Sequence, residues 1–250
     1  MPVLLVVFAA CHPQPSCPLF DTGVQDAAIG DAPPRTSRVL IYSGLTGFRH
    51  ASIPTAVEAL ALHFLDAGIE SDRVSDIVDL TPDRFDGYGA IVFVSTTGEP
   101  LGVADSELNR SLLAYVRQGG GLVGVHAVDD AYDGCSRFNA LVGGWFAGHP
   151  GDLRMNTCAT HGAHPALGAL TPMFAIEDEF HLLWNFRADN EVLVTCTTED
   201  GAGSMPISWV RNEGAGRVFV TTLGHPDAAY ADPRFVGHVI AGTAWVLRQR

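Results

Sequence analysis

The chain has 250 residues, of which 47 % are hydrophobic and 17 % are charged. This composition excludes a disordered chain and a coiled coil, and the length suffices for one large α/β domain or two small ones. A formal net charge of −13 argues against nucleic acid or an anionic membrane surface as a partner, because both would repel the protein. Ten histidines against fifteen lysines and arginines are a surplus that indicates metal binding or acid–base chemistry.

The N-terminal segment, residues 1–11, resembles the end of a bacterial secretory signal. An apolar run leads into Ala9, Ala10 and Cys11, as at a lipoprotein cleavage site, although no basic residue precedes the run. Residues 12–37 are rich in proline, glycine, aspartate and serine, which is typical of a disordered linker. We therefore expect an exported protein of the bacterial cell envelope, lipid-anchored through Cys11. The alternative is an ordinary apolar N-terminus that forms a buried first strand.

Two of the other cysteines lie in strand-like runs. Cys158 and Cys196 could pair, and free buried thiols are an equally good interpretation, because spacing alone does not decide between them. A CxxC pattern of the kind that binds zinc is absent from the sequence.

From residue 38 onward, apolar runs alternate with helical patterns. These patterns predict strands at 38–43, 90–98 and 122–126, a weak strand within 69–80, and helices at 52–67 and 104–117. Unbroken apolar strands that alternate with helices indicate a parallel sheet with helices on both faces. The second half is richer in β-structure, with strands predicted at 153–160, 191–197, 206–210 and 217–222, a helix that begins near 136, and a closing helix at 233–247. We expect residues 38–250 to form one domain.

In such sheets, ligands bind beyond the carboxyl ends of the strands. The loops that follow the strands at 38–43, 90–98 and 122–126 should therefore converge on one cleft. This convergence would gather Phe48, Arg49, His50, Thr96, Thr97, Glu99, His126, Asp129 and Asp130.

Histidines are the candidates for chemistry at this edge, and His50, His126 and His225 each follow a predicted strand there. His126 ends the strand GLVGVH, where many α/β enzymes carry a serine or cysteine nucleophile, but the GxSxG motif is absent. His149 and His225 each stand in a Gly-His-Pro turn, which suits a preorganised ligand or base. The alternatives are a histidine that merely bonds a neighbouring carbonyl and ordinary tight turns.

The segment IEDEFHLLWNFR, residues 176–187, alternates acids with aromatic residues. Carboxylates that accept hydrogen bonds from hydroxyl groups, beside aromatic rings that stack on the sugar, are typical of a sugar site. An amphipathic surface segment has the same pattern. Glu179 or Asp178 would be the carboxylate partner of the histidines. Histidine and carboxylate ligands also suit Zn²⁺ or another divalent metal, but a short motif such as HExxH is absent.

Several motifs occur in an order that resembles a known family. They are SGLTGFRHASIP, FVSTTGEPL, YVRQGGGLVGVHA, LVGGWFAGHP, WNFR, PISWV, GRVFVTTLGH and YADPRFVGHVIAGTAWV, and they span residues 38–248. Together they resemble a ThuA-like domain of the trehalose-utilisation family. The resemblance implies a flavodoxin-like α/β fold related to class I glutamine amidotransferases, with the amidotransferase cysteine position altered. It also implies sugar metabolism, and it marks Arg49, His50, His126, His149 and His225 as site residues.

The chain departs from the family pattern around the expected pocket. After His126 it lacks the aromatic-proline segment that such proteins often show, EDEFHLLWNF replaces a DEWYNF-like run, and LGHP replaces an LGHT-like turn. The identity of the substrate is therefore open.

We expect an exported carbohydrate-acting protein, a hydrolase or isomerase of glycosides or keto-glycosides, and not a glutamine amidotransferase. The alternative is a non-catalytic carbohydrate-binding or scaffolding domain at the cell surface. The expected catalytic residues are His126, His225 and Glu179. The expected substrate-binding residues are Phe48, Arg49, His50, Thr97, Asp129, Trp184 and Tyr230. A divalent metal such as zinc, if present, would be held by His126, His149 and His225.

Overall fold

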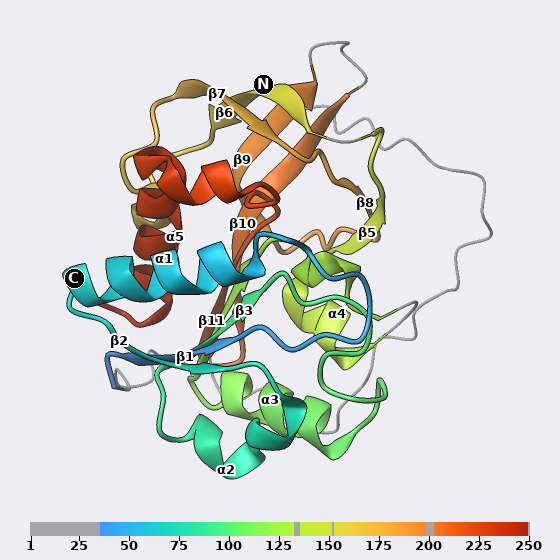
Figure 1. Ribbon diagram of the computed structural model, residues 1–250, viewed down its shortest axis with the longest axis vertical. Coiled ribbons are helices and arrows are strands. Elements are labelled where there is room, and N and C mark those ends of the chain that lie inside the picture. Colours follow the sequence, from blue (N-terminus) through green and yellow to red (C-terminus); the bar gives the residue numbers. More distant parts are fainter. Residues whose placement is uncertain (1–35, 133–135, 152, 199–202, 250) are drawn as a thin grey trace.

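The computed structural model describes residues 36–132, 136–151, 153–198 and 203–249 (Figure 1). The expected signal segment, the lipid anchor on Cys11 and nearly all of the linker lie outside the described residues. Within these residues, each helix is too short or too polar to cross a membrane.

One nine-stranded sheet runs through the molecule in the order β2-β1-β3-β4-β11-β10-β9-β6-β7. Its parallel half comprises β1 (Arg38–Tyr42), β2 (Glu70–Val74), β3 (Ala90–Val94), β4 (Gly121–Val125) and β11 (Gly216–Thr221). This half has the flavodoxin-like strand order, with β11 in the fifth place. The predicted parallel sheet is confirmed for these five strands.

The other half of the sheet is antiparallel, as Figure 1 shows for the long ribbon beyond β11. It comprises β6 (Arg154–Thr160), β7 (Met173–Asp178), β9 (Glu191–Thr198) and β10 (Ser204–Glu213), while β5 (Trp145–Gly148) and β8 (Leu182–Trp184) form a separate pair. The prediction of a β-rich second half is confirmed. The prediction named none of β5, β7 and β8, because each is short or lacks a long apolar run.

Helices cover both faces of the sheet, as predicted. One face carries α1 (Ile53–Asp66) and α5 (Pro233–Val246), and the other carries α2 (Pro82–Phe85), α3 (Glu107–Arg117) and α4 (Arg137–Val142). Short 3-10 turns lie at Ile77–Asp79, Val128–Asp130, Pro165–Leu167 and Asp227–Ala231. Alternate residues of one strand serve the two cores: Val39 and Ile41 pack toward α1 and α5, whereas Leu40 and Tyr42 face the other side.

Two predicted boundaries differ from the structure for local reasons. The helix expected from residue 104 begins at Glu107, because the Ser106 side chain accepts a hydrogen bond from the backbone N–H of Asn109 and caps the helix there. The strand expected to reach residue 98 ends at Val94, because Ser95 adopts a left-handed backbone with φ of +50°.

Two glycines at the start of β4 each meet a steric demand. Gly119 has φ of +103° where the chain leaves α3. A Cβ on Gly121 would lie 2.1 Å from Cγ1 of Val246, so the absence of a side chain lets α5 pack directly on β4.

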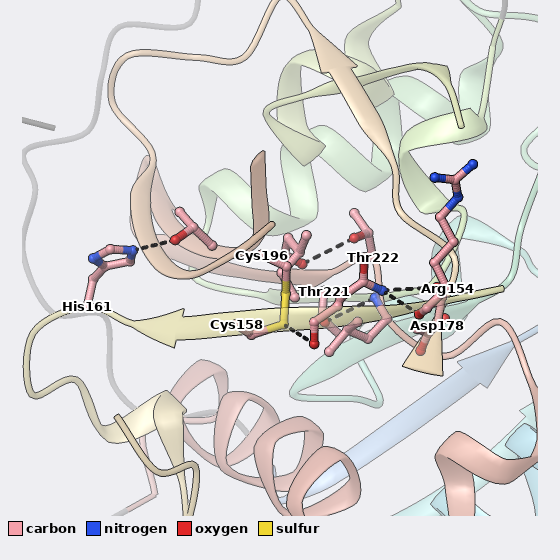
Figure 2. The surroundings of a disulfide bond; sticks show 11 residues. Arg154, Cys158, His161, Asp178, Cys196, Thr221 and Thr222 are labelled. Atoms are coloured by element: carbon pink, nitrogen blue, oxygen red, sulfur yellow. Dashed lines mark hydrogen bonds between the residues drawn. A yellow bond between two sulfur atoms is a disulfide. The ribbon is translucent and has the colours of Figure 1, made fainter. Parts of the chain in front are cut away.

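Cys158 in β6 and Cys196 in β9 face each other across the antiparallel pair and form a disulfide. Figure 2 shows this bridge, with Asp178 at the end of β7 nearby. Both cysteines are buried, at 0 % and 1 % exposure. The sequence left open whether these two cysteines pair or remain free buried thiols, and in the structure they pair.

Candidate functional site

His126 is the first residue beyond β4, and β11 holds both its backbone and its ring. Its N–H donates to the carbonyl of Thr221 at 3.0 Å, and Nδ1 lies 2.8 Å from the carbonyl oxygen of Thr222. Because a carbonyl oxygen only accepts, Nδ1 carries the hydrogen and Nε2 presents a lone pair. The residue is fully buried, and Nε2 has no hydrogen-bond partner within the described residues.

Two further histidines surround His126 at the carboxyl edge of the sheet. His50 follows β1, His225 follows β11, and the three imidazole centroids lie 4.6 Å (His50–His126), 5.1 Å (His50–His225) and 5.1 Å (His126–His225) apart. Each pair of rings is close to perpendicular, with interplanar angles of 84°, 88° and 86°. The strand-end placement expected for these three residues thus brings their rings together at one point.

Glu179 joins the histidines because Asp178 fixes the turn after β7. The Asp178 carboxylate accepts hydrogen bonds from the backbone N–H groups of Glu179 (2.8 Å), Gly224 (2.8 Å) and His225 (3.0 Å). One buried side chain therefore ties the end of β7 to the loop after β11. Burial raises the pKa of Asp178 to about 6, and the three N–H donors limit that rise.

His181 bridges two carboxylates, so both of its ring nitrogens are engaged in hydrogen bonds. Its Nδ1 lies 2.9 Å from Oδ2 of Asp129, and its Nε2 lies 2.9 Å from Oε2 of Glu179. Burial opposes a charge on the ring, but both carboxylates favour it and raise the pKa of His181 to about 10. His181 is therefore an imidazolium that donates from both nitrogens and holds the Glu179 carboxylate in place.

The electrostatics of the group keep its inner histidines neutral and its glutamate ionised. Burial, followed by the neighbouring His225, lowers the pKa of His50 to about 4, and burial also lowers that of His126 well below its usual range. Burial alone would raise the pKa of Glu179, but its contacts with His181 and His225 hold it far below the usual range. The contact with Glu179 raises the pKa of His225.

His50, His126, Glu179 and His225 each offer one ligand atom, and these four atoms lie within 4.8 Å of one another. We refer to these four residues as the His–Glu cluster. Imidazole nitrogens and a carboxylate oxygen form a donor set suited to divalent transition metals, so the cluster has the composition of a metal site. It reaches solvent through His225, whose side chain is 31 % exposed.

Other predicted site residues lie at the rim or behind it. His149, expected among the metal ligands, is not part of the cluster: its Nε2 lies 3.5 Å from Oε1 of Glu179, and its side chain is 38 % exposed. Phe48 and Arg49 are exposed near the cluster, with the Phe48 ring centroid 4.9 Å from that of His50. Thr97 donates to the Phe48 carbonyl at 2.8 Å and supports this loop.

The remaining three predicted substrate-binding residues are buried or lie outside the His–Glu cluster. Asp129 is fully buried behind His181. Trp184 is half-buried, donates through Nε1 to the carbonyl of Phe146 at 3.2 Å and is not one of the cluster residues. Tyr230 is buried at 3 % exposure, beneath the turn at Gly224. Of the seven predicted substrate-binding residues, Phe48 and Arg49 are the exposed ones.

The sequence did not reveal the bridge from Asp129 through His181 to Glu179. His181 belongs to the segment 176–187, whose alternative interpretation was an amphipathic surface, yet Glu179, Phe180 and His181 are buried at 7 %, 1 % and 1 % exposure. The available signal was three consecutive charged residues, Glu177 to Glu179, running directly into an aromatic residue and a histidine.

Comparison with known proteins gives one family and one fold. Residues 38–246 match the family model described as ThuA, trehalose utilisation. A ThuA-like protein from Parabacteroides merdae ATCC 43184 is similar in structure, with a TM-score of 0.71, 20 % identity, and coverage of 84 % of this chain and 89 % of that chain. A ThuA-like protein from Bacteroides uniformis ATCC 8492 gives a TM-score of 0.68, 18 % identity, and coverage of 87 % and 94 %.

A beta-galactosidase from Rahnella sp. R3 contains a similar fold in part of its length. The TM-score is 0.59 at 15 % identity, with coverage of 86 % of this chain but only 32 % of that chain. No curated protein matches the sequence. At these identities the solved structures show the shared fold alone.

Proposed function

The chain belongs to the ThuA (trehalose utilisation) family, and from this premise we propose that it is an enzyme acting on a carbohydrate through the His–Glu cluster. The observation that carries the proposal is the convergence of three histidines and a glutamate, from four separate loops, at the carboxyl edge of the sheet. A purely structural role would not require three neutral or partly exposed imidazoles around one carboxylate. The presence of a similar fold within a beta-galactosidase is in keeping with a carbohydrate substrate.

The reaction class that fits these groups is hydrolysis or isomerisation of a glycoside or keto-glycoside. Both reactions need proton transfer, and in a keto-glycoside this occurs next to a carbonyl, which imidazole performs near neutral pH. His225 is the member of the cluster that meets solvent most openly, and its Nδ1 lies 3.3 Å from Oε2 of Glu179. We assign the reaction to the His–Glu cluster, which a substrate reaches on the side of His225. His126 lies deeper and presents its Nε2 lone pair to the same space.

The test is a screen of glycosides and 3-keto-glycosides, with product formation followed by chromatography. We expect turnover by the wild-type protein and a loss of about 10²- to 10⁴-fold in kcat for His225→Ala, the range that general acid–base catalysis contributes. His63→Ala is the matched control, because His63 is exposed on α1 and is not part of the cluster.

Two results would contradict the proposal. One is binding of a carbohydrate without turnover of any member of the panel, which would favour a non-catalytic binding domain. The other is unchanged turnover in His225→Ala.

We also propose that the protein is exported to the bacterial cell envelope. The support is the buried disulfide between Cys158 and Cys196, because such bonds form and persist mainly in oxidising compartments. Detection of the native chain in the periplasmic or membrane fraction with this bond intact is the expected result. A reduced chain confined to the cytosol would overturn the proposal.

A further inference from the structure

His126 Nε2 poses a specific physical problem. It is a buried lone pair whose tautomer is fixed by the Thr222 carbonyl, and it has no hydrogen-bond partner within the described residues. A buried acceptor left in this way costs about 1–3 kcal/mol. Nδ1 of His50 and Nδ1 of His225 are also buried without a hydrogen-bond partner there. A single electron-pair acceptor, such as a metal ion, would be a partner for all three buried nitrogen atoms.

The spacing of the rings fits a single ion at their centre. Three imidazoles bound tetrahedrally at Zn–N distances of about 2.0–2.1 Å would have ring centroids about 5 Å apart. The observed centroid separations are 4.6, 5.1 and 5.1 Å. Nδ1 of His225 and Oε2 of Glu179 are 3.3 Å apart, close to the roughly 3.4 Å expected between two ligand atoms of one tetrahedral zinc ion.

The surrounding groups orient these side chains as the outer shell of a metal site does. A histidine ligand usually donates its second N–H to a carbonyl or carboxylate, as His126 does to Thr222. A carboxylate ligand is usually held by a further hydrogen bond, as Glu179 is by His181. Asp129 lies 2.9 Å from the other nitrogen of His181, so two buried side chains in series hold the Glu179 carboxylate in place.

We propose that His50, His126, His225 and Glu179 bind one divalent transition-metal ion, with zinc as the first candidate. This donor set differs from the one that the sequence predicted, because Glu179 and His50 replace His149. His149 lies at the solvent rim, where its Nε2 contacts the far oxygen of Glu179. This metal site is the site of the proposed function. The geometry alone carries the binding of the ion, and only the role of the ion in a reaction rests on the proposed function.

The test measures metal binding directly, without substrate. The full chain is stripped with a chelator, and zinc is titrated against it by calorimetry and by competition with a chromophoric chelator. We expect one tightly bound ion per chain. Cobalt(II) added to the stripped protein should give visible absorption bands that saturate at the same ratio.

Variants identify the ligands. We expect His225→Ala and His50→Ala to weaken zinc binding by at least about 100-fold, because each removes one of four ligands. His225 is partly exposed, so its removal leaves the core packing in place. His149→Ala and the exposed His63→Ala are the matched controls, and both should retain one bound ion.

The metal proposal and the proposed function fail in different ways. Absence of binding of zinc, manganese and nickel to the wild-type chain would overturn the metal site. So would equal zinc affinity in wild type, His50→Ala and His225→Ala, which would indicate scattered surface sites. Zinc binding that depends on these ligands, without turnover of any carbohydrate, would sustain the metal site and count against the enzyme.

Discussion

His126 combines an unusual backbone with a fixed ring. His126 and the following Ala127 both have left-handed φ values, of 49° and 54°, which cost about 1–3 kcal/mol for residues other than glycine. The backbone and ring contacts to Thr221 and Thr222 hold this conformation. The sequence predicted that His126 lies at the end of a buried strand. It could not predict the left-handed turn, because neither residue is a glycine or asparagine and the stabilising carbonyls lie in a strand far along the chain.

A different histidine, His238, makes the stability of the fold depend on pH. It is fully buried in α5, where its Nδ1–H donates to the Ala166 carbonyl at 2.7 Å and its Nε2 lies 2.8 Å from Oγ of Ser208. Burial lowers the pKa of His238 to about 4. Above pH 6.5 the ring is neutral in the folded and unfolded chains alike. Between pH 6.5 and pH 4, His238 binds a proton in the unfolded chain but not in the folded chain. The free energy of unfolding therefore falls as the pH falls.

We predict that this single group accounts for a loss of about 3 kcal/mol in the free energy of unfolding between pH 7 and pH 4. His238→Gln should be less stable than wild type at pH 7 but should lose that much less on acidification. Urea denaturation at a series of pH values measures the two slopes. His63→Gln serves as the control, and an identical pH slope in His238→Gln and wild type would refute the prediction.

At the level of elements, the sequence could place those site residues that follow a strand it predicted. Apolar runs located β1, β4 and β11, and because parallel strands end at a common edge, His50, His126 and His225 were expected to be neighbours. Glu179 was expected as their partner but had no predicted strand to place it. β7 alternates exposed and buried residues, and its last buried position is a carboxylate, Asp178, where a sequence pattern would require an apolar residue. Hydrogen bonds to backbone N–H groups of the β11 loop explain that exception.

The antiparallel extension of the sheet depends on its disulfide. The bond between Cys158 and Cys196 closes a segment with a sequence separation of 38 residues, for which the chain-entropy model gives about 4 kcal/mol. We predict that Cys158→Ala/Cys196→Ala lowers the free energy of unfolding by about 2–4 kcal/mol while the cluster residues keep their positions. Urea denaturation with and without dithiothreitol measures the effect. A reductant that changes neither protein, together with two more reactive thiols in the unfolded wild type than in the unfolded double variant, would show that the bond does not form.

For the whole molecule, a bound ion would connect loops that follow four different strands, β1, β4, β7 and β11. A ligand that binds only the folded chain stabilises it by about 2.7 kcal/mol at a free concentration of 100 times its Kd. We therefore predict that zinc at this concentration raises the Tm of the stripped protein by roughly 5–10 °C. Differential scanning calorimetry measures the shift. His225→Ala should show almost none of it, and a shift of equal size in that variant would locate the bound zinc elsewhere.

The position of β11 has a consequence for how the chain reaches its native state. Arg217 of β11 pairs with Gly121 of β4, and β11 also pairs with β10, so a late segment occupies the middle of the sheet. During synthesis, β4 leaves the ribosome well before its neighbour and presents an unpaired edge until residues 216–221 emerge. Long-range pairing of this kind slows folding and exposes a nascent chain to aggregation. The same strand delivers the carbonyl of Thr221 and leads directly to Thr222 and His225, so the sheet and the His–Glu cluster are completed by one late event.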